Sequence, residues 1–149
     1  MAAVAAKIKE FEEIDTQVLS CSVDSVYTHK VWNDQELSKM SGQIPFPMMS
    51  DQNGELGKMY GVYEEQYGVD LRGTFVIDPD GNLQSIEVLS LPVGRNVMEG
   101  LRQIKANQLV RKTKEKEVTP AMWEPGKKTI KPRTELVGNV WQEWNISDL

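Results

Sequence analysis

A strand–turn–strand segment near the middle of the chain most constrains its fold. Residues 73–78 and 83–89 are rich in aliphatic and β-branched side chains and are separated by Pro79-Asp80-Gly81. Proline presets φ at about −65° and glycine tolerates positive φ, so this tripeptide predicts a tight hairpin turn. Arg72 precedes the first strand, and Arg95 begins a helix expected over 94–112. The pattern therefore predicts a β-hairpin that presents two arginines.

The rest of the chain alternates helical and extended patterns. Asp24 and Ser25 are both good N-caps for the second of the expected helices. The helices are expected over 2–13, 25–40 and 54–60, and the strands over 16–23 and 47–51. This alternation predicts an α/β, three-layer thioredoxin-like domain.

The character of the chain changes after Lys112. Residues 113–149 show little periodicity and carry three prolines, which favours an extended arm lying on another surface. Tryptophans in such a segment predict a docking surface, on the chain's own body or on a partner; they are Trp123, Trp141 and Trp144. We expect a core over 1–112 and a C-terminal arm over 113–149.

Composition excludes several classes of function. A net charge of −5 gives no attraction to nucleic acid, and no apolar run is long enough to cross a membrane. One cysteine, Cys21, and one histidine, His29, exclude a disulfide framework and a cysteine or histidine metal centre. The N-terminus lacks the features of a signal peptide. We expect a cytoplasmic protein with no metal or other cofactor.

Several short motifs follow one another in a definite order. They are Ser22-Val23-Asp24-Ser25 with His29 and Trp32, Ile44-Pro45-Phe46-Pro47 with Ser50-Asp51, Tyr60-Gly61-Val62, Arg72-Gly73, Leu91-Pro92-Val93-Gly94-Arg95 and Val118-Thr119-Pro120-Ala121. In this order the chain resembles a peroxiredoxin of the alkyl hydroperoxide reductase C subunit, or thiol-specific antioxidant, type. The resemblance covers nearly the whole chain.

The resemblance implies thiol-dependent reduction of hydrogen peroxide and organic hydroperoxides. Arg72 would be the residual active-site arginine, Arg95 would support it, and His29 and Trp32 would line the pocket. A homo-oligomer, dimeric or higher, and a thioredoxin-like thiol reductant are implied as partners. The residues alone also allow structural roles. Arg72 could form an ion pair with Asp70, and Arg95 could simply belong to the first turn of a helix. His29 and Trp32 could be structural residues.

Two departures from the family pattern affect the function. The family's peroxidatic cysteine lies in a Pro-x-x-x-Thr-x-x-Cys loop, whereas residues 2–7 here resemble the helix just beyond that cysteine. Thr119 occupies the resolving position and has no thiol. We expect the chain alone to be inactive and to be the tail of a longer protein. One explanation for a chain that begins at Met1 is an upstream selenocysteine codon that was read as a stop codon. Proteolysis, or expression of a shortened segment, would give the same N-terminus.

The missing segment in the family includes the central strand of the sheet, so unpaired strand edges would remain. The gap could close by pairing Val18–Val23 with Thr74–Ile77, by swapping a segment with a second chain, or through the arm. We therefore expect a rearranged or intertwined domain.

Two other functions are compatible with the sequence. The chain could be a non-catalytic binding or regulatory subunit of a full-length peroxiredoxin. It could instead sense redox state through Cys21, although the apolar run around that residue predicts a buried structural thiol.

Overall fold

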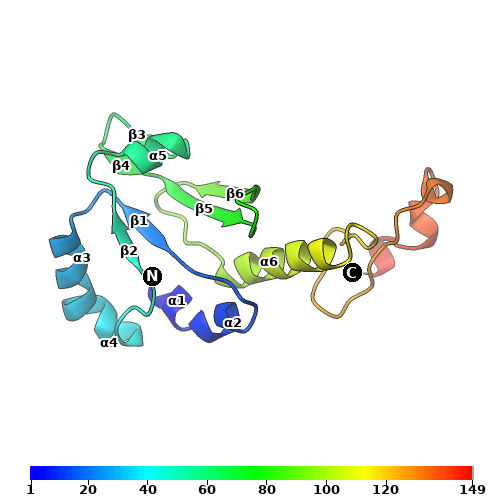
Figure 1. Ribbon diagram of the computed structural model, residues 1–149, viewed down its shortest axis with the longest axis horizontal. Coiled ribbons are helices and arrows are strands. Elements are labelled where there is room, and N and C mark those ends of the chain that lie inside the picture. Colours follow the sequence, from blue (N-terminus) through cyan, green and yellow to red (C-terminus); the bar gives the residue numbers. More distant parts are fainter. Residues whose placement is uncertain (149) are drawn as a thin grey trace. The chain divides into compact units, whose positions relative to one another are not determined.

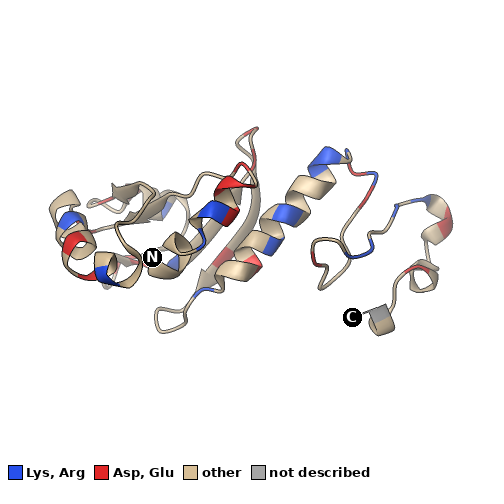
Figure 2. Cartoon of the chain, turned by 90° about the horizontal axis from the view of Figure 1, so that it is seen from below, with Lys and Arg blue, Asp and Glu red and all other residues tan. Residues whose placement is uncertain are grey.

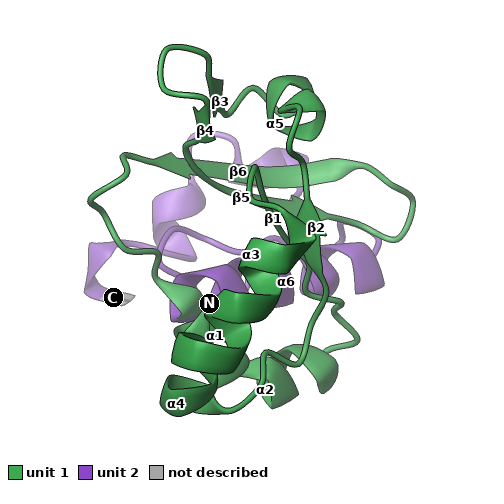
Figure 3. Cartoon of the chain, turned by 90° about the vertical axis from the view of Figure 1, so that its left-hand side faces the viewer, with its two compact units in different colours: residues 1–97 green, residues 98–149 purple. Residues whose placement is uncertain are grey.

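The computed structural model describes residues 1–148. The chain forms two compact units, residues 1–97 and residues 98–149 (Figure 3). The first unit carries all the strands that are named below, and the second carries one long helix followed by short turns.

The first unit begins with two short helices, α1 (Ala2–Ala5) and α2 (Ile8–Glu12). A single helix was expected over residues 2–13, but the backbone leaves helical geometry at Lys7, where φ is −112°. Ala5 and Phe11 are buried, so both helices contribute an apolar side chain to the core.

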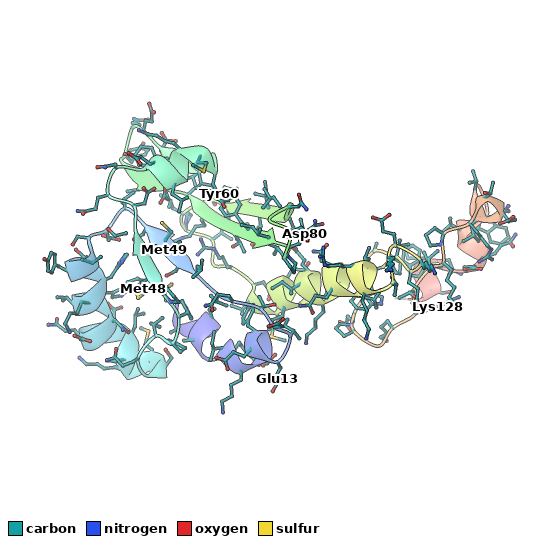
Figure 4. All side chains as sticks on the ribbon, viewed as in Figure 1. Glu13, Met48, Met49, Tyr60, Asp80 and Lys128 are labelled. Carbon is teal, nitrogen blue, oxygen red and sulfur yellow. The ribbon has the colours of Figure 1, made fainter. Side chains whose placement is uncertain are left out.

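A parallel strand pair forms the centre of the unit. Strand β1 (Ser20–Ser22) pairs with β2 (Met48–Ser50), which carries the two methionines labelled in Figure 4. The chain crosses between them through α3 (Val26–Trp32), a π-helical turn at Asn33–Leu37 and α4 (Ser38–Ser41). Figure 1 shows α3 beside β2.

One of the two expected caps holds the start of α3. The Ser25 hydroxyl accepts the backbone N–H of Thr28 at 3.1 Å. This bond satisfies one of the amide groups that a helix leaves without an intrahelical partner. The N-cap expected at Ser25 is therefore confirmed.

A small lobe follows that the sequence did not predict in full. Helix α5 (Glu55–Met59) confirms the expected helical turns. The short strands β3 (Tyr63–Glu64) and β4 (Val69–Asp70) then pair antiparallel. Gly57 of α5 is buried, and a Cβ there would lie 2.0 Å from Oδ1 of Asp70. The lobe therefore needs glycine at this position.

The predicted hairpin is confirmed. Strands β5 (Arg72–Ile77) and β6 (Leu83–Leu89) pair antiparallel, with Arg72 opposite Leu89. The Asp78 carboxylate closes the turn by accepting the backbone N–H groups of Asp80 and Asn82, each at 2.9 Å. Asp80 marks this turn in Figure 4.

The three strand pairs remain separate sheets. Among residues 1–148, β1 pairs only with β2 and β5 only with β6. Closure of the gap by direct pairing of residues 18–23 with residues 74–77 is therefore absent from the described chain. Swapping with a second chain, and closure by the arm, stay predictions.

The second unit consists of α6 (Val97–Lys112) and the segment after it. The helix begins three residues later than the sequence indicated. Its one acidic side chain, Glu99, lies near its start, and the basic side chains of Arg102, Lys105, Arg111 and Lys112 follow (Figure 2). Val118 and Ile130 pair across a loop whose centre is Trp123, only 3% exposed. Three short 3-10 turns follow, at Thr134–Leu136, Val140–Gln142 and Ile146–Asp148.

The loop is attached to α6 by one arginine. Arg102 donates to the Trp123 carbonyl at 2.9 Å and holds the Glu99 carboxylate with two N–H groups at 2.7 Å. The Trp123 indole N–H donates to the Lys127 carbonyl at 3.1 Å. No helix within residues 1–148 is long and apolar enough to span a bilayer.

Candidate active site

Arg72 lies at the start of β5 in a tight backbone turn. The N–H of Gly73 donates to the carbonyl of Leu71 at 2.8 Å, which makes Arg72 the central residue of a three-residue turn. Its Nε–H donates to the carbonyl of Leu91 at 3.0 Å. No ion pair joins Arg72 to Asp70 in the part of the chain that the structure describes, so the pairing considered above is absent.

Arg95 lies close to Arg72 and is held in a similar way. Its Nη2 donates to the carbonyl of Gly73 at 2.9 Å. Burial and the charge of Arg72 lower the pKa of Arg95, and Glu87 opposes this change. Neither guanidinium forms an ion pair with a carboxylate of residues 1–148. The structure thus brings the two predicted arginines together as a pair of cations without an ion-pair partner.

Residue 1 lies near this pair. Burial, and then the charges of Arg95 and Arg72, lower the pKa of the Met1 α-amino group. Residue 1 is therefore within electrostatic range of both guanidiniums. The positive field of the two guanidiniums favours a ligand or a reacting atom that carries negative charge.

His29 and Trp32 lie on α3, away from the hairpin in sequence. His29 is 7% exposed, and its Nε2 lies 2.8 Å from the Ser22 hydroxyl, which donates to the Asp24 carboxylate at 2.9 Å. The Ser22 hydroxyl thus joins the imidazole of His29 to the carboxylate of Asp24. Within residues 1–148, Nδ1 has no hydrogen-bond partner.

A shallow pocket lies beside His29 on the surface of α3. Its walls are apolar side chains of Val26, Ile44, Phe46 and Met48, and its rim includes Lys30 and Asp34. Lys30 and Asp34 form an ion pair with each other. Trp32 is not among the lining residues. The roles predicted for His29 and Trp32 at the arginine site stay predictions.

Cys21 is exposed, so the prediction of a buried thiol is wrong. Its register partner Met49 is 37% exposed, which leaves the face that both share open. An apolar run implies burial only where both faces of its strand are covered, and the face that carries Cys21 is exposed. Burial and the charges of Asp51 and Asp70 raise the pKa of the thiol. A raised pKa lowers the thiolate fraction, so Cys21 is a poor nucleophile.

Asp51 was named within a sequence motif and Asp70 as a possible partner of Arg72, but neither carboxylate was expected beside Cys21. Asp51 accepts the backbone N–H of Gly57 at 2.8 Å, and hydrogen bonds of this kind lower its pKa. Burial and the charge of Asp51 raise the pKa of Asp70, whose Oδ1 is buried and unpaired within residues 1–148. Asp51 stands three residues before Gly54, the N-cap of α5, and this spacing indicates its contact with the start of that helix. No local pattern indicates that Asp70 lies beside Cys21.

Thr119, at the expected resolving position, lies in the second unit. It is half-buried and follows Val118, which exchanges two backbone hydrogen bonds with Ile130. A hydroxyl cannot form a disulfide, so Thr119 cannot take the part of a resolving thiol. In residues 1–148 no group of three or more histidine, cysteine or acidic side chains is placed to hold a metal ion.

Comparison with known proteins gives consistent matches along the chain. Residues 1–86 match the AhpC/TSA family, and residues 106–143 match the C-terminal domain of 1-Cys peroxiredoxin. The selenocysteine-containing peroxiredoxin PrxU of Peptoclostridium acidaminophilum is 60% identical in an alignment of 149 residues, which covers 99% of this chain and 73% of PrxU. A thioredoxin peroxidase of Trypanosoma brucei rhodesiense is 45% identical, over 84% of this chain and 62% of its own length.

A solved structure supports the fold. The reduced 2-Cys peroxiredoxin of Plasmodium vivax superposes with a TM-score of 0.83 at 37% identity, over 90% of this chain and 68% of that one. The predicted thioredoxin-like α/β fold is confirmed, while the predicted rearrangement is not tested by this match.

Proposed function

Because the chain belongs to the AhpC/TSA family of peroxiredoxins, we propose that its parent protein reduces hydrogen peroxide and organic hydroperoxides. The observation that carries this proposal is the pair of guanidiniums, Arg72 and Arg95, each fixed by a backbone carbonyl. A guanidinium has five N–H donors, so one such bond leaves others to bind peroxide oxygens. Donors fixed in advance stabilise the negative charge that develops on the departing oxygen.

We propose that the attacking atom, a thiolate sulfur or a selenolate selenium, comes from outside the 149 residues. It attacks one peroxide oxygen, the O–O bond breaks, and an S–O or Se–O bond forms. The leaving oxygen takes a proton and departs as water or alcohol. The chalcogen is thereby oxidised by two electrons to a sulfenic or selenenic acid, and the peroxide is reduced by two electrons.

Three observations support an external nucleophile. Cys21 is the only cysteine of the chain, and burial and two carboxylates raise its pKa. Met1 lies within electrostatic range of Arg72 and Arg95, so a group attached before it would enter their field. The relative at 60% identity is named for a selenocysteine, which supports selenium as one choice of attacking atom.

The return of the oxidised chalcogen to its reduced form needs thiols from another molecule. With threonine at residue 119, we propose an external thiol or dithiol protein, such as a thioredoxin-like reductant. We also propose a core over 1–112 with an arm over 113–149, a cytoplasmic homo-oligomer, and no metal or other cofactor. Supporting roles for His29 and Trp32 in the pocket belong to the same proposal.

Peroxide consumption with dithiothreitol tests the proposal directly. The chain of 149 residues is expected to consume peroxide no faster than its Cys21→Ser variant. A longer protein with a cysteine or selenocysteine before residue 1 is expected to be active. In that protein Arg72→Lys should lower kcat/KM by roughly 100-fold, the order found for the loss of one fixed donor. Activity of the short chain that depends on Cys21 would refute an external nucleophile.

The exposed arm favours a second candidate, a non-catalytic subunit of a full-length peroxiredoxin. Val137, Trp141 and Ile146 are 80%, 64% and 82% exposed, so these apolar side chains are accessible to a partner. The intact mass of the native protein separates the two candidates. A mass near 16.9 kDa together with co-purification of a longer peroxiredoxin would favour the subunit, and a larger mass would favour the truncated enzyme.

A further inference from the structure

The two arginines are held by each other's backbone segments. Arg72 donates to the carbonyl of Leu91, four residues before Arg95, and Arg95 donates to the carbonyl of Gly73, the residue after Arg72. The two bonds, 3.0 and 2.9 Å long, join the start of β5 to the segment that follows β6. We call this arrangement the arginine clasp.

The Leu91 carbonyl lies in a tight turn just beyond the hairpin. Arg72 is in register with Leu89, the last residue of β6. Its side chain extends past the end of that strand and donates its hydrogen bond to the carbonyl of residue 91. The N–H of Val93 donates to the carbonyl of Ser90 at 3.0 Å, which places Leu91 and Pro92 at the two central positions. The direction of the Leu91 carbonyl thus decides where Nε of Arg72 is held.

Proline after Leu91 limits the conformations that this carbonyl can adopt. The proline ring clashes with a helical conformation of the preceding residue, so fewer backbone conformations are open to Leu91 than before another residue type. The ψ angle of a residue sets the direction of its own carbonyl, so this restriction acts on the Leu91 oxygen. Proline also fixes its own φ and reduces the freedom of the open turn.

We infer that Pro92 is a positioning residue for Arg72, acting through the carbonyl of Leu91. The inference rests on the proposed function, in which Arg72 binds the peroxide, and it adds the element that orients the guanidinium. No charged side chain is needed for this orientation, because a backbone carbonyl holds each guanidinium. Both cations are therefore oriented while their charge stays available to an anionic ligand.

A proton–nitrogen correlation spectrum of the 149-residue chain at mildly acidic pH tests the clasp through the arginine Nε–H signals. Arg72→Lys identifies the Arg72 signal by its loss. Hydrogen bonding to Leu91 predicts slow exchange of this proton with water, compared with arginine free in the buffer. Pro92→Gly is expected to shift the equilibrium constant between the closed and open clasp about two- to fivefold toward the open form, the range that follows from the entropy of one fixed residue. Its Nε–H exchange should accelerate by the same factor.

The matched control is Pro79→Gly, the same replacement in the exposed turn at the other end of the hairpin. It is expected to leave the Arg72 signal unchanged. Pro92→Ala, which retains a Cβ, is the second variant if glycine prevents folding; backbone signals of β5 and β6 report folding in each case. Exchange as fast as that of free arginine in the unchanged chain would refute the clasp. Unchanged protection in both Pro92 variants would refute the role of Pro92.

Inorganic phosphate provides an independent measurement on the same samples. Phosphate is expected to shift the Nε–H signals of Arg72 and Arg95, with binding about two- to fivefold weaker in Pro92→Gly. A protected Arg72 signal without any phosphate shift would count against the proposed anion-binding role while supporting the clasp. A failure of the proposed function and a failure of this inference are therefore distinguishable.

Discussion

Replacing Trp123 with alanine is expected to open the arm. The side chain is 3% exposed, and its indole N–H donates to the Lys127 carbonyl. Arg102 holds the Trp123 carbonyl against α6. Because the paired residues Val118 and Ile130 flank this loop, loss of the indole removes the apolar group at its centre.

The magnitude follows from the buried area of the indole. A tryptophan buries about 150–250 Å², which corresponds to roughly 4–6 kcal/mol at about 25 cal/mol per Å². A compact unfolded arm already buries part of this area, so the measured loss should lie at about 3–5 kcal/mol. Trp123→Phe keeps an aromatic ring and removes the N–H donor. The lost hydrogen bond adds about 0.5–1.5 kcal/mol to the cost of the smaller ring.

Amide hydrogen exchange at Val118 and Ile130 measures the opening of the arm. Their N–H groups donate to each other's carbonyls at 2.8 and 2.9 Å, so both become exchangeable only when the loop opens. Trp141→Ala is the matched control, because Trp141 is 64% exposed and its loss should change protection by less than about 0.5 kcal/mol. Equal loss of protection in the two alanine variants would refute the reasoning.

Three further predictions concern the lobe around α5 and the thiol beside it. Gly57→Ala should lower the urea-measured stability by about 1–3 kcal/mol, because its Cβ would lie 2.0 Å from Oδ1 of Asp70. Gly100→Ala, with nothing within 4 Å, should instead stabilise α6 by up to about 1 kcal/mol, and similar effects at both glycines would contradict the steric argument. Burial and Asp51 raise the pKa of Asp70 above its ordinary 3.8, so the folded state binds this proton more tightly and loses stability as pH rises above 3.8. Asp70→Asn should therefore raise stability at neutral pH and not below pH 3.8, and a gain that is equal at all pH values would oppose this origin. Burial and two carboxylates raise the pKa of Cys21, so iodoacetamide should label Cys21 more slowly than it labels glutathione at neutral pH. Asp51→Asn should accelerate the labelling of Cys21, and mass spectrometry measures both rates. If Cys21 is labelled as fast as glutathione, the hypothesis that Cys21 senses redox state regains support.

The hairpin could be predicted because its information is local. The turn residues Pro79-Asp80-Gly81 and the apolar strands lie within one short segment, and the observed register joins Arg72 to Leu89. The positions of the two arginines at the ends of this segment were visible in the sequence, and their roles were inferred from the family resemblance. Their backbone partners could not be identified, since a residue type gives no information on where its own carbonyl points.

Contacts that depend on neighbours distant in sequence were missed. Burial was expected for Cys21 from the apolar run around it, but the face of β1 that it shares with Met49 is open. Strands β3 and β4 are two residues each and lack the alternation that marks longer strands. The arm shows no periodic spacing of apolar residues. The burial of Trp123 in a loop held by Arg102 could therefore not be predicted from the hydrophobic pattern.

The arginine half of the proposed site is encoded within one continuous segment. Both clasp bonds, the turn around Arg72 and the turn at Pro92 arise from residues 71–95. None of them needs the nucleophile, the arm or a second chain. A chain with only this segment in place therefore presents two oriented cations with no attacking atom between them. Orientation of the arginines and chemical activity are thus separate properties. The 149-residue chain can show oriented arginines and still need an external thiolate or selenolate for activity.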